Sequence, residues 1–591
     1  MKATKPLQNP DRRQFVTGLG LVVAGAHMPF DASAGVSLGV SNAPSELRGT
    51  EFDLSVAALP VNLTGRAATA VAVNGTLPGP VLRWREGDTV TLRVANRLGV
   101  DTSIHWHGIL LPSNMDGVPG FSFHGIAPGE TYTYRFQLKQ AGTYWYHAHS
   151  SLQEAKGVFG AIVVEPREAD PIAADRDYVV LLSDWSDEDP HAIVRKLKIQ
   201  GDYYNRHKQT VGDLFRDARR DGWEATLADR KAWGAMRMSP TDLADVNAIT
   251  YTYLINGIAP DGNWTGLFKR GEKVRLRFIN GSAMTFFDVR IPGLKLTVVS
   301  ADGQPVHPVS VDEFRIGVAE TFDVLVTPQE DQAYTVFAQA MDRSGYARGT
   351  LSPRLGLSAP VPALDARALL TMADMGHGGM AEMKGMEGGC GANMKGAMDH
   401  SKMDHSSMAG MDHSSSAGML VHPASESNNP AVDMQTMSPS KALDDPGIGL
   451  RGNGRRVLTY SDLHSSFADP DPRDPGRTVE LHLTGNMERY VWGFDGIPFS
   501  KADPIRLNYG ERLRIVLVND TMMEHPIHLH GLWSDLENEA GEFQVRKHTV
   551  NVPPGHLRSY RVSADALGRW AYHCHMLLHM ELGMFREVRV E

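Results

Sequence analysis

The strongest constraint on the fold is one stretch of sequence that recurs three times, at residues 73–96, 255–280 and 494–519. Each copy begins with an apolar residue, an Asn or Asp, and a Gly, and each ends on an asparagine nine residues after a second glycine. Between that glycine and the asparagine, apolar and polar residues alternate, which is typical of a β-strand with one buried face. The repeat therefore predicts three copies of one β-rich domain.

Short strands punctuated by Gly and Pro, with little helical spacing inside the repeats, predict an all-β fold with one β-sandwich in each copy. We place the three domains at residues 46–168, 175–357 and 455–591. The β pattern breaks at 186–247, where we expect a short helical insertion in the second domain. Residues 358–454 are expected to form a flexible linker before the third domain.

The repeat also places histidines at matching positions of the first and third copies. A histidine follows the closing asparagine by nine residues in both copies, and a His-x-His pair follows a later glycine by eighteen residues in both. The eight histidines found in this way are His105, His107, His147, His149, His528, His530, His573 and His575. Because the two copies are related domains, the simplest arrangement packs the first against the third with all eight side chains between them.

The second copy has no histidine at these positions. Its ninth residue after the asparagine is Val289, and the later strand near residues 334–339 also lacks one. We therefore expect the middle domain to supply no ligands. Eight imidazoles exceed the needs of one or two ions, and copper is among the metals that imidazole suits. Three copper ions, a pair and a single ion, fit this number.

A cysteine lies between two of these histidines near the end of the chain. In a β-strand, successive side chains point to opposite faces, so His573 and His575 would share one face while Cys574 points to the other. The histidine pair would then face one metal centre and the thiolate another. The backbone of three residues would be a short covalent path for electrons between the two centres.

The cysteine side offers the ligands of a blue copper, namely two histidines, one thiolate and a weak axial methionine. The candidate set is His525, Cys574, His579 and Met584. The first domain has Thr102 and Ala148 where the third has His525 and Cys574, so one such centre is expected. Zinc is disfavoured because it has no redox chemistry to use the connection between centres.

These ligand motifs, four in number and in this order, resemble those of the multicopper oxidases over nearly the whole chain. The resemblance implies three consecutive cupredoxin-like domains and four copper ions, one of type 1, one of type 2 and two of type 3. It implies type 1 ligands His525, Cys574, His579 and Met584, type 2 ligands His105 and His528, and type 3 ligands His107, His147, His149, His530, His573 and His575. Within the family, residues 509–537 and a methionine-rich insertion are most similar to the periplasmic copper-resistance oxidases of the CopA type.

Asp116 follows the first ligand motif and precedes Gly117. It is similar to the family's acid that helps deliver protons during oxygen reduction, and the alternative is an ordinary aspartate in a turn before glycine. Some metal-oxidising relatives carry a glutamate just before the second type 1 histidine, where this chain has Leu578. This departure counts against a second proton relay.

The N-terminus predicts export. Arg12 and Arg13 precede an apolar stretch and then small residues at 32–34, which together are typical of a twin-arginine signal peptide over residues 1–34. We therefore expect a periplasmic protein, although a disordered basic N-terminus is an alternative. No segment has the eighteen or more apolar residues that a spanning helix needs. The formal charge of −10, with no basic run, argues against nucleic acid as a partner.

A methionine-rich stretch lies inside the predicted linker. Of the 26 methionines, 11 lie between residues 372 and 419, where the unit Met-Asp-His-Ser occurs three times. Few branched or aromatic residues occur there, so the stretch cannot form a core of its own. Thioethers select Cu(I), and Cys390 could add a thiolate. We expect additional Cu(I) to bind here, and an inert linker is the alternative.

Together these features predict an enzyme that takes single electrons at the blue copper and reduces O₂ to water after four transfers. The expected electron donor is Cu(I). It would give its electron on the side of His525 and His579, because a histidine edge can reach the surface. The role would be copper resistance, with periplasmic copper-handling proteins as possible partners. A laccase-like oxidase of small phenols and a copper-sequestering protein without activity are the alternatives. A two-domain nitrite reductase would need neither three domains nor eight paired histidines.

Overall fold

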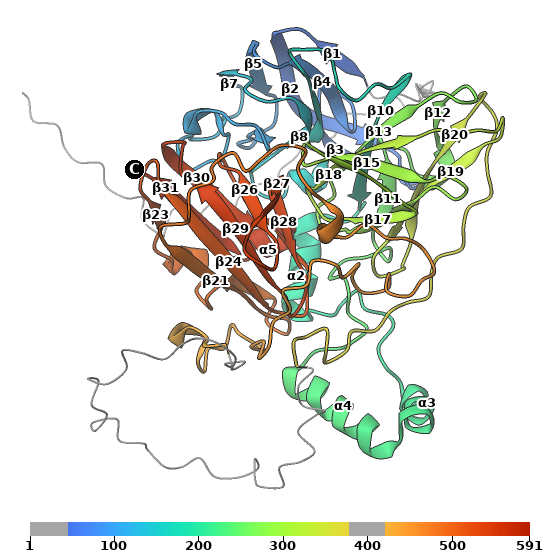
Figure 1. Cartoon of the computed structure of the whole chain (residues 1–591), viewed down its shortest axis with the longest axis vertical. Helices are drawn as coiled ribbons and strands as arrows, with labels where there is room; N and C mark the ends of the chain where they lie inside the picture. The colour runs from blue at the N-terminus through green and yellow to red at the C-terminus, as the bar shows by residue number, and fades with distance from the viewer. Residues whose placement is uncertain (1–44, 378–419) are drawn as a thin grey trace, which may run out of the picture. The chain divides into compact units, whose positions relative to one another are not determined.

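The computed structural model describes residues 45–377 and 420–591. The predicted signal peptide, Cys390 and residues 378–419 of the methionine-rich stretch lie outside the described residues. The strands of the described chain form six sheets, which are paired as three sandwiches in sequence order (Figure 1). Among the described residues, no helix combines the length and the apolar character needed to cross a membrane.

The first domain pairs a five-stranded sheet, in the order β1-β4-β9-β8-β6, with a four-stranded sheet, in the order β3-β2-β5-β7. Its strands are β1 (Glu46–Arg48), β2 (Glu51–Val61), β3 (Ala68–Val73), β4 (Gly79–Arg85), β5 (Thr89–Asn96), β6 (His105–His107), β7 (Thr131–Gln137), β8 (Gly142–His147) and β9 (Phe159–Glu165). Trp84 on β4 packs against Phe136 on β7 with ring centroids 6.0 Å apart. Apolar side chains therefore fill the space between the two sheets.

The second domain pairs a six-stranded sheet, in the order β11-β10-β13-β18-β15-β16, with a five-stranded sheet, in the order β12-β20-β19-β14-β17. Its strands are β10 (Arg176–Trp185), β11 (Thr252–Ile255), β12 (Trp264–Leu267), β13 (Val274–Asn280), β14 (Phe287–Arg290), β15 (Leu296–Ala301), β16 (Gln304–Val311), β17 (Glu313–Ile316), β18 (Thr321–Val326), β19 (Tyr334–Ala340) and β20 (Tyr346–Ser352). Phe278 on β13 meets Phe314 on β17 at 5.3 Å, which joins the sheets in the same way.

The third domain pairs sheets in the orders β22-β21-β24-β29-β26-β27 and β23-β31-β30-β25-β28. Its strands are β21 (Thr478–Asn486), β22 (Val491–Phe494), β23 (Ile505–Leu507), β24 (Arg512–Asp520), β25 (His525–Leu529), β26 (Ser534–Glu537), β27 (Phe543–Lys547), β28 (Thr549–Val552), β29 (Leu557–Ser563), β30 (Gly568–Cys574) and β31 (Phe585–Val590). Phe494 on β22 stacks on Tyr572 of β30 with centroids 5.6 Å apart. The strands that carry candidate ligands in this domain, β25 and β30, are neighbours in its five-stranded sheet.

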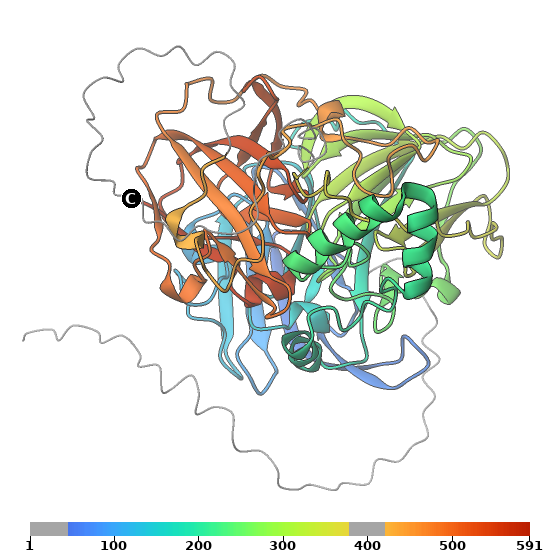
Figure 2. The same cartoon turned by 90° about the horizontal axis from the view of Figure 1, so that it is seen from below.

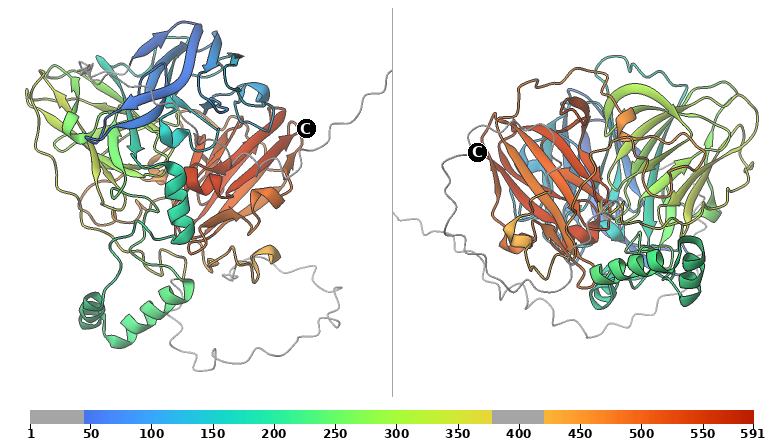
Figure 3. Two further views of the ribbon diagram at one scale, coloured as in Figure 1. Left: turned by 180° about the vertical axis from the view of Figure 1, so that it is seen from behind. Right: turned by 60° about the horizontal axis from the view of Figure 1, so that its bottom comes forward.

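The predicted helical insertion is present in the second domain. Its helices are α2 (Pro190–Ile199), α3 (Val211–Asp221) and α4 (Trp223–Met236), and a short helix α5 (Leu577–Glu581) follows β30 in the third domain. Asp189 caps α2 by accepting a hydrogen bond from the backbone of His191, and a capping box of Thr210 and Asp213 begins α3. Figures 1 and 3 show α3 and α4 lying outside the sheets.

The repeated strand has the same place in each domain. It is β5, β13 and β24, and each pairs in parallel with the first long strand of its domain and antiparallel to a later one. The closing asparagines Asn96, Asn280 and Asn519 are fully buried, and each donates two side-chain hydrogen bonds to backbone carbonyls farther along the chain. Asparagine recurs there because buried carbonyls need a donor.

Polar contacts join the three domains to one another. Arg277 on β13 donates to Thr143 on β8, and Thr143 donates to Asp323 on β18 at 2.7 Å. Lys547 lies 2.9 Å from Asp302, which connects the third domain to the second. Figure 2 shows strands of all three domains side by side. The predicted all-β fold of three sandwiches with a helical insertion is confirmed.

Candidate metal centres

The eight paired histidines lie on neighbouring strands of the first and third domains. β6 carries His105 and His107, and His147 at the end of β8 is the register partner of His105. In the third domain, His528 on β25 is the register partner of His573 on β30. The remaining three follow these strands by one or two residues, at His149, His530 and His575. All eight are buried except His149, which is partly buried.

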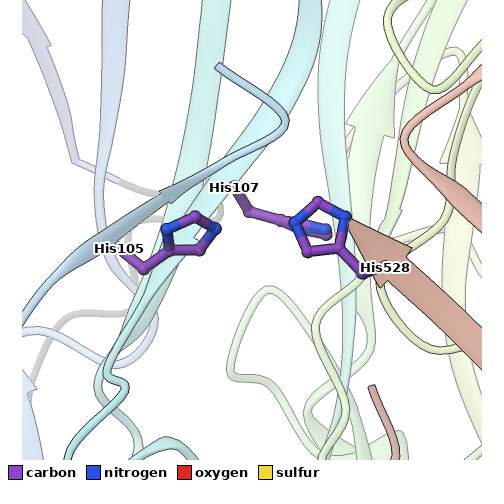
Figure 4. Close-up of side chains that lie close together, drawn as sticks. All are labelled: His105, His107 and His528. Carbon is purple, nitrogen blue, oxygen red and sulfur yellow. The ribbon is translucent and has the colours of Figure 1, made fainter. Parts of the chain in front are cut away.

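The structure brings these histidines together in three groups, and each group takes residues from both domains. The groups are His105, His107 and His528, then His107, His147 and His575, and finally His149, His530 and His573. Within a group, one ring nitrogen of each residue lies within 4.8 Å of the others. Figure 4 shows the first group, with His528 reaching the two histidines of β6 from the other domain. The expected packing of the first domain against the third is therefore observed.

Ring nitrogens without partners show that these groups fit metal ions. Five buried nitrogens in the groups have no hydrogen-bond partner among the described residues, namely His105 Nε2, His107 Nδ1, His149 Nε2, His528 Nε2 and His575 Nδ1. Two further pairs of ring nitrogens face each other, at 3.0 Å between His530 and His573 and at 3.3 Å between His147 and His575. A buried nitrogen left unpaired is costly, and a cation would remove that cost.

The protonation states of the rings also suit metal ligands. Burial, reinforced by repulsion between neighbouring imidazoles, lowers the pKa values of six histidines well below their usual range. These six are His107, His147, His149, His528, His530 and His575. Burial likewise lowers the pKa of His573 to about 3. Neutral imidazole is the form that binds metals, so these seven histidines are in their ligand form at neutral pH.

The outer ring nitrogens are held by acceptors around the cage. His105 Nδ1 and His528 Nδ1 contact backbone oxygens, of Asp116 at 2.8 Å and of His548 at 2.6 Å. His147 Nδ1 lies 2.6 Å from a carboxylate oxygen of Glu154 on the 3₁₀ helix η3 (Glu154–Lys156). Such acceptors fix the tautomer and the ring orientation of metal ligands.

Asp116 lies between the two domains in direct contact with the cage. It follows the 3₁₀ helix η2 (Ser113–Met115) and is buried. Its Oδ2 lies 2.8 Å from His530 Nδ1, and its Oδ1 lies 3.3 Å from His105 Nδ1. A carboxylate in this position contacts one histidine from each domain, so it is more than a residue of a turn.

Three of the candidate blue-copper ligands, His525, Cys574 and His579, meet on the other face of β30. Cys574 Sγ lies 3.5 Å from His525 Nδ1 and 3.8 Å from His579 Nδ1, and the two nitrogens are 3.2 Å apart. Met584 is fully buried, and its carbonyl accepts a hydrogen bond from the backbone of Cys574. Burial raises the pKa of the Cys574 thiol, so a thiolate here requires a neighbouring cation.

The expectation that a type 1 histidine edge reaches the surface is wrong. His525 and His579 are fully buried, and their outer nitrogens are occupied. His525 Nε2 lies 2.7 Å from Thr521 Oγ1, and His579 Nε2 lies 2.7 Å from a carboxylate oxygen of Asp245 in the second domain. The ring edges of His525 and His579 do not reach solvent, because the loop before β11 and the turn after β24 supply hydrogen-bonding partners to their Nε2 atoms.

Sequence reasoning missed Glu154, Asp245, Thr521 and His548. His548 is buried beside the cage, its ring centroid is 4.6 Å from that of His107, and burial lowers its pKa to about 4. Thr521 lies four residues before His525, which is the only local signal among the four. Glu154 and His548 contact histidines of the cage, and Asp245 contacts His579 of the Cys574 set; no motif of the sequence indicates these contacts.

Comparisons with known proteins agree with this arrangement. Three family models, each described as multicopper oxidase, match residues 55–169, 176–353 and 472–591. Copper resistance protein A of Escherichia coli is 63% identical, over 99% of this chain and 100% of that protein. Copper resistance protein A of Pseudomonas syringae pv. tomato is 62% identical, over 98% of this chain and 99% of that protein.

Solved structures share the fold at low identity. Fet3p, described as a multicopper oxidase that functions in iron import, gives a TM-score of 0.63 at 17% identity, over 92% of this chain and 91% of that one. The laccase from Botrytis aclada gives 0.61 at 20% identity, over 93% and 89%. The three domains are thus cupredoxin-like, as predicted. The chain belongs to the multicopper oxidase family, the copper-dependent oxidoreductases with oxygen as acceptor.

Proposed function

We propose that this protein is a periplasmic copper-resistance oxidase that oxidises Cu(I) to Cu(II) and reduces O₂ to water. The proposal rests on two buried ligand sets that share one strand. Cys574 lies on one face of this strand, and its neighbouring histidines lie on the other. Similarity to copper resistance protein A along nearly the whole chain supports the biological role. Export by the twin-arginine route belongs to the same proposal, and residues 1–34 lie outside the described part of the chain.

We assign four copper ions to the candidate ligands of the cage and of the Cys574 set. The type 1 ion takes His525, Cys574, His579 and Met584, the type 2 ion takes His105 and His528, and the type 3 pair takes His107, His147, His149, His530, His573 and His575. Bound copper would supply the one-electron redox chemistry that the polypeptide lacks. Cys574 is joined through single peptide bonds to His573 and His575, which gives a short path between the two ligand sets.

We assign proton delivery to Asp116. Its carboxylate contacts His530 of the third domain, while its backbone oxygen contacts His105 of the first. A small cavity next to the cage is lined by His105, Leu110, His528 and Trp533. From this place Asp116 would hold a proton at Oδ2 and release it toward the cage.

Methionines near the type 1 ligands support Cu(I) as the donor. Four of them, Met284, Met341, Met523 and Met576, line one cavity together with Asp342 and Glu524. Met523 lies two residues before His525, and Met576 lies two residues after Cys574. Thioethers prefer Cu(I), and the carboxylates would balance its charge. The methionine-rich stretch 378–419 would supply additional Cu(I), although it lies outside the described residues.

Oxygen consumption by the copper-loaded protein tests the proposal, with Cu(I) as the only reductant and a phenol as the competing donor. We expect faster uptake with Cu(I), and deletion of residues 378–419 should slow it at limiting copper without affecting the phenol. Faster turnover of the phenol would favour a laccase-like oxidase instead. If Cys574→Ser abolished oxygen uptake but left the copper tolerance of cells intact, sequestration without catalysis would be the better account.

A further inference from the structure

A further cluster of ligand-type side chains lies outside the copper cage and the Cys574 set. It consists of His422, Glu426, His482 and Asp520, and one ligand atom of each lies within 4.8 Å of the others. Glu426 ends the 3₁₀ helix η6 (Ala424–Glu426), while His482 lies on β21 and Asp520 ends β24. Those three residues are buried, and His422 is partly buried.

The inward atoms of the cluster converge on one point. His482 Nδ1 lies 2.6 Å from Asp520 Oδ2. His422 Nδ1 lies 3.2 Å from that same oxygen and 3.2 Å from Glu426 Oε2. Glu426 Oε1 is buried, has no hydrogen-bond partner among the described residues, and lies 3.7 Å from His482 Nδ1. An unpaired buried carboxylate oxygen that faces a ring nitrogen is a vacant ligand atom.

The outward atoms of the two rings are held in place. His422 Nε2 contacts the backbone oxygen of Thr436 at 3.0 Å, and His482 Nε2 lies 3.4 Å from a carboxylate oxygen of Glu480. Each imidazole therefore has an acceptor on its Nε2 side and presents Nδ1 to the cluster. Histidines that bind metals show this arrangement, in which a carbonyl or carboxylate accepts from the nitrogen that does not bind.

The two carboxylates are held in the same manner. Asp520 Oδ1 accepts a hydrogen bond from the backbone of Thr436 at 2.7 Å, which leaves Oδ2 facing the rings. Glu426 Oε2 accepts one from Gln435 at 2.9 Å, which leaves Oε1 free. All four candidate ligands are thus fixed from outside, and the site needs little rearrangement to receive an ion.

We propose that His422, Glu426, His482 and Asp520 bind one divalent transition-metal ion, Cu(II) or Zn(II), separately from the four coppers of the oxidase. In their deprotonated forms the two imidazoles and two carboxylates offer four nitrogen and oxygen donors, and the two negative charges balance a divalent cation. The hydrogen bond to Asp520 raises the pKa of His422 to about 9, and Asp520 also raises the pKa of His482 despite its burial, so a bound ion would displace protons from the rings. Imidazole donors favour these ions over Mg(II) and Ca(II), which prefer oxygen ligands only. Between the two candidates, the general order of affinities favours copper.

The site is close to the type 1 set through the backbone. Asp520 directly precedes Thr521, whose hydroxyl oxygen lies 2.7 Å from His525 Nε2. An ion on Asp520 would therefore hold the turn that positions a type 1 ligand. The proposal does not depend on the identity of the electron donor, because it uses only this cluster.

Metal content tests the proposal on the full-length protein after its four main sites have been filled with copper. Samples would be dialysed to equilibrium against Zn(II) or, in a second arm, Cu(II), and bound metal would be measured by mass spectrometry. We expect one further equivalent in the wild type. Glu426→Gln should weaken its binding about 100-fold, as expected for the loss of a fixed ligand. His307→Gln, at an exposed histidine, is the matched control and should bind like the wild type.

Two additional samples separate this site from other histidines and from misfolding. The triple variant His400→Gln, His405→Gln and His413→Gln removes histidines of the methionine-rich stretch and should retain the equivalent. His422→Gln changes a partly exposed residue and provides a second variant if Glu426→Gln proves unstable by circular dichroism. Co(II) should give visible absorption bands typical of four-coordinate cobalt in the wild type, in His307→Gln and in the triple variant, and these bands should be lost in Glu426→Gln and His422→Gln. Equal metal content in the wild type and both cluster variants would mean that the four residues form a buried ion-pair network, and it would overturn the proposal.

Discussion

The middle domain and the two outer domains use the same strand for different purposes. On β6 and β25 of the outer domains the buried residues include His105, His107 and His528, whereas β14 of the middle domain carries Asp288 and Val289. Asp288 is fully buried and paired with Arg315 at 2.8 Å and with Arg343 at 2.6 Å. One scaffold therefore holds either a cage of imidazoles or a network of ion pairs, and the buried side chains alone decide which.

The middle domain nevertheless contributes to both centres from outside. Asp245 contacts the outer nitrogen of His579, and Asp302 accepts hydrogen bonds from the backbones of His548 and Thr549 beside the cage. In our assignment the outer domains supply the ligands and the middle domain supplies part of their orientation. Substitutions in each domain test that division.

Cys574→Ser should have the largest effect, because it removes a ligand that the third domain alone provides. We expect oxygen uptake with Cu(I) to fall about 1000-fold or more, equivalent to ~4 kcal/mol in activation free energy. The blue colour of the oxidised, copper-loaded protein should disappear, while three of the four coppers remain by metal analysis. Uptake within tenfold of the wild type would show that the cysteine set is not the entry point for electrons.

Asp116→Asn should have the next largest effect, because this residue contacts histidines of both outer domains. The amide keeps the size of the side chain but cannot hold an exchangeable proton in the same way, so we expect oxygen reduction to fall about 100-fold. Copper content should stay unchanged. The matched control is Asp101→Asn, at an exposed position of the same domain, which should behave like the wild type.

The solvent isotope effect on that variant sharpens the test. If proton delivery limits Asp116→Asn, its rate of oxygen uptake should fall further in deuterated water than that of the wild type. A variant with lower copper content and no added isotope effect would instead assign Asp116 to holding His530 and His105 in place.

Asp245→Asn tests the contribution of the middle domain most directly. Its carboxylate lies 2.7 Å from His579 Nε2, so the amide would weaken an orienting contact without touching a ligand-forming atom. We expect Cu(I) oxidation to fall about tenfold, which is the smaller effect expected when a hydrogen-bond acceptor behind a metal ligand is lost. The reduction potential of the blue site should also shift. Asp261→Asn, exposed in the same domain, is the control. Unchanged kinetics and potential would confine the function to the outer domains.

The parts of the molecule that could be predicted from the sequence are those with fixed spacing. The spacing of nine residues from Gly87 to Asn96 recurs because the strand must end where its asparagine reaches two backbone carbonyls. The same regularity located the histidines that meet in the cage. Local spacing thus determines both the scaffold and the positions from which ligands project.

The acceptors behind the ligands could not be predicted, because no local pattern constrains them. Asp245 is 334 residues from His579 in the sequence, and its neighbourhood has neither strand periodicity nor a motif. Glu154 lies seven residues after His147, but no regular spacing in the sequence predicts that its carboxylate contacts the ring nitrogen. Contacts of this kind depend on how the strands pack, which a single sequence does not specify.

Asn280→Ala should have the smallest effect on catalysis, and it tests whether the scaffold is really shared. The substitution removes two buried hydrogen bonds, to the carbonyls of Thr285 and Ile316, so we expect a loss of about 2 kcal/mol in stability. The midpoint of denaturant unfolding should fall by a similar amount in Asn96→Ala, whose side chain makes the equivalent bonds in the first domain. Copper content should stay unchanged in Asn280→Ala because β14 carries no histidine. If this variant lost copper while keeping its stability, the middle domain would have to hold a ligand after all, and the contrast with the outer domains would be wrong.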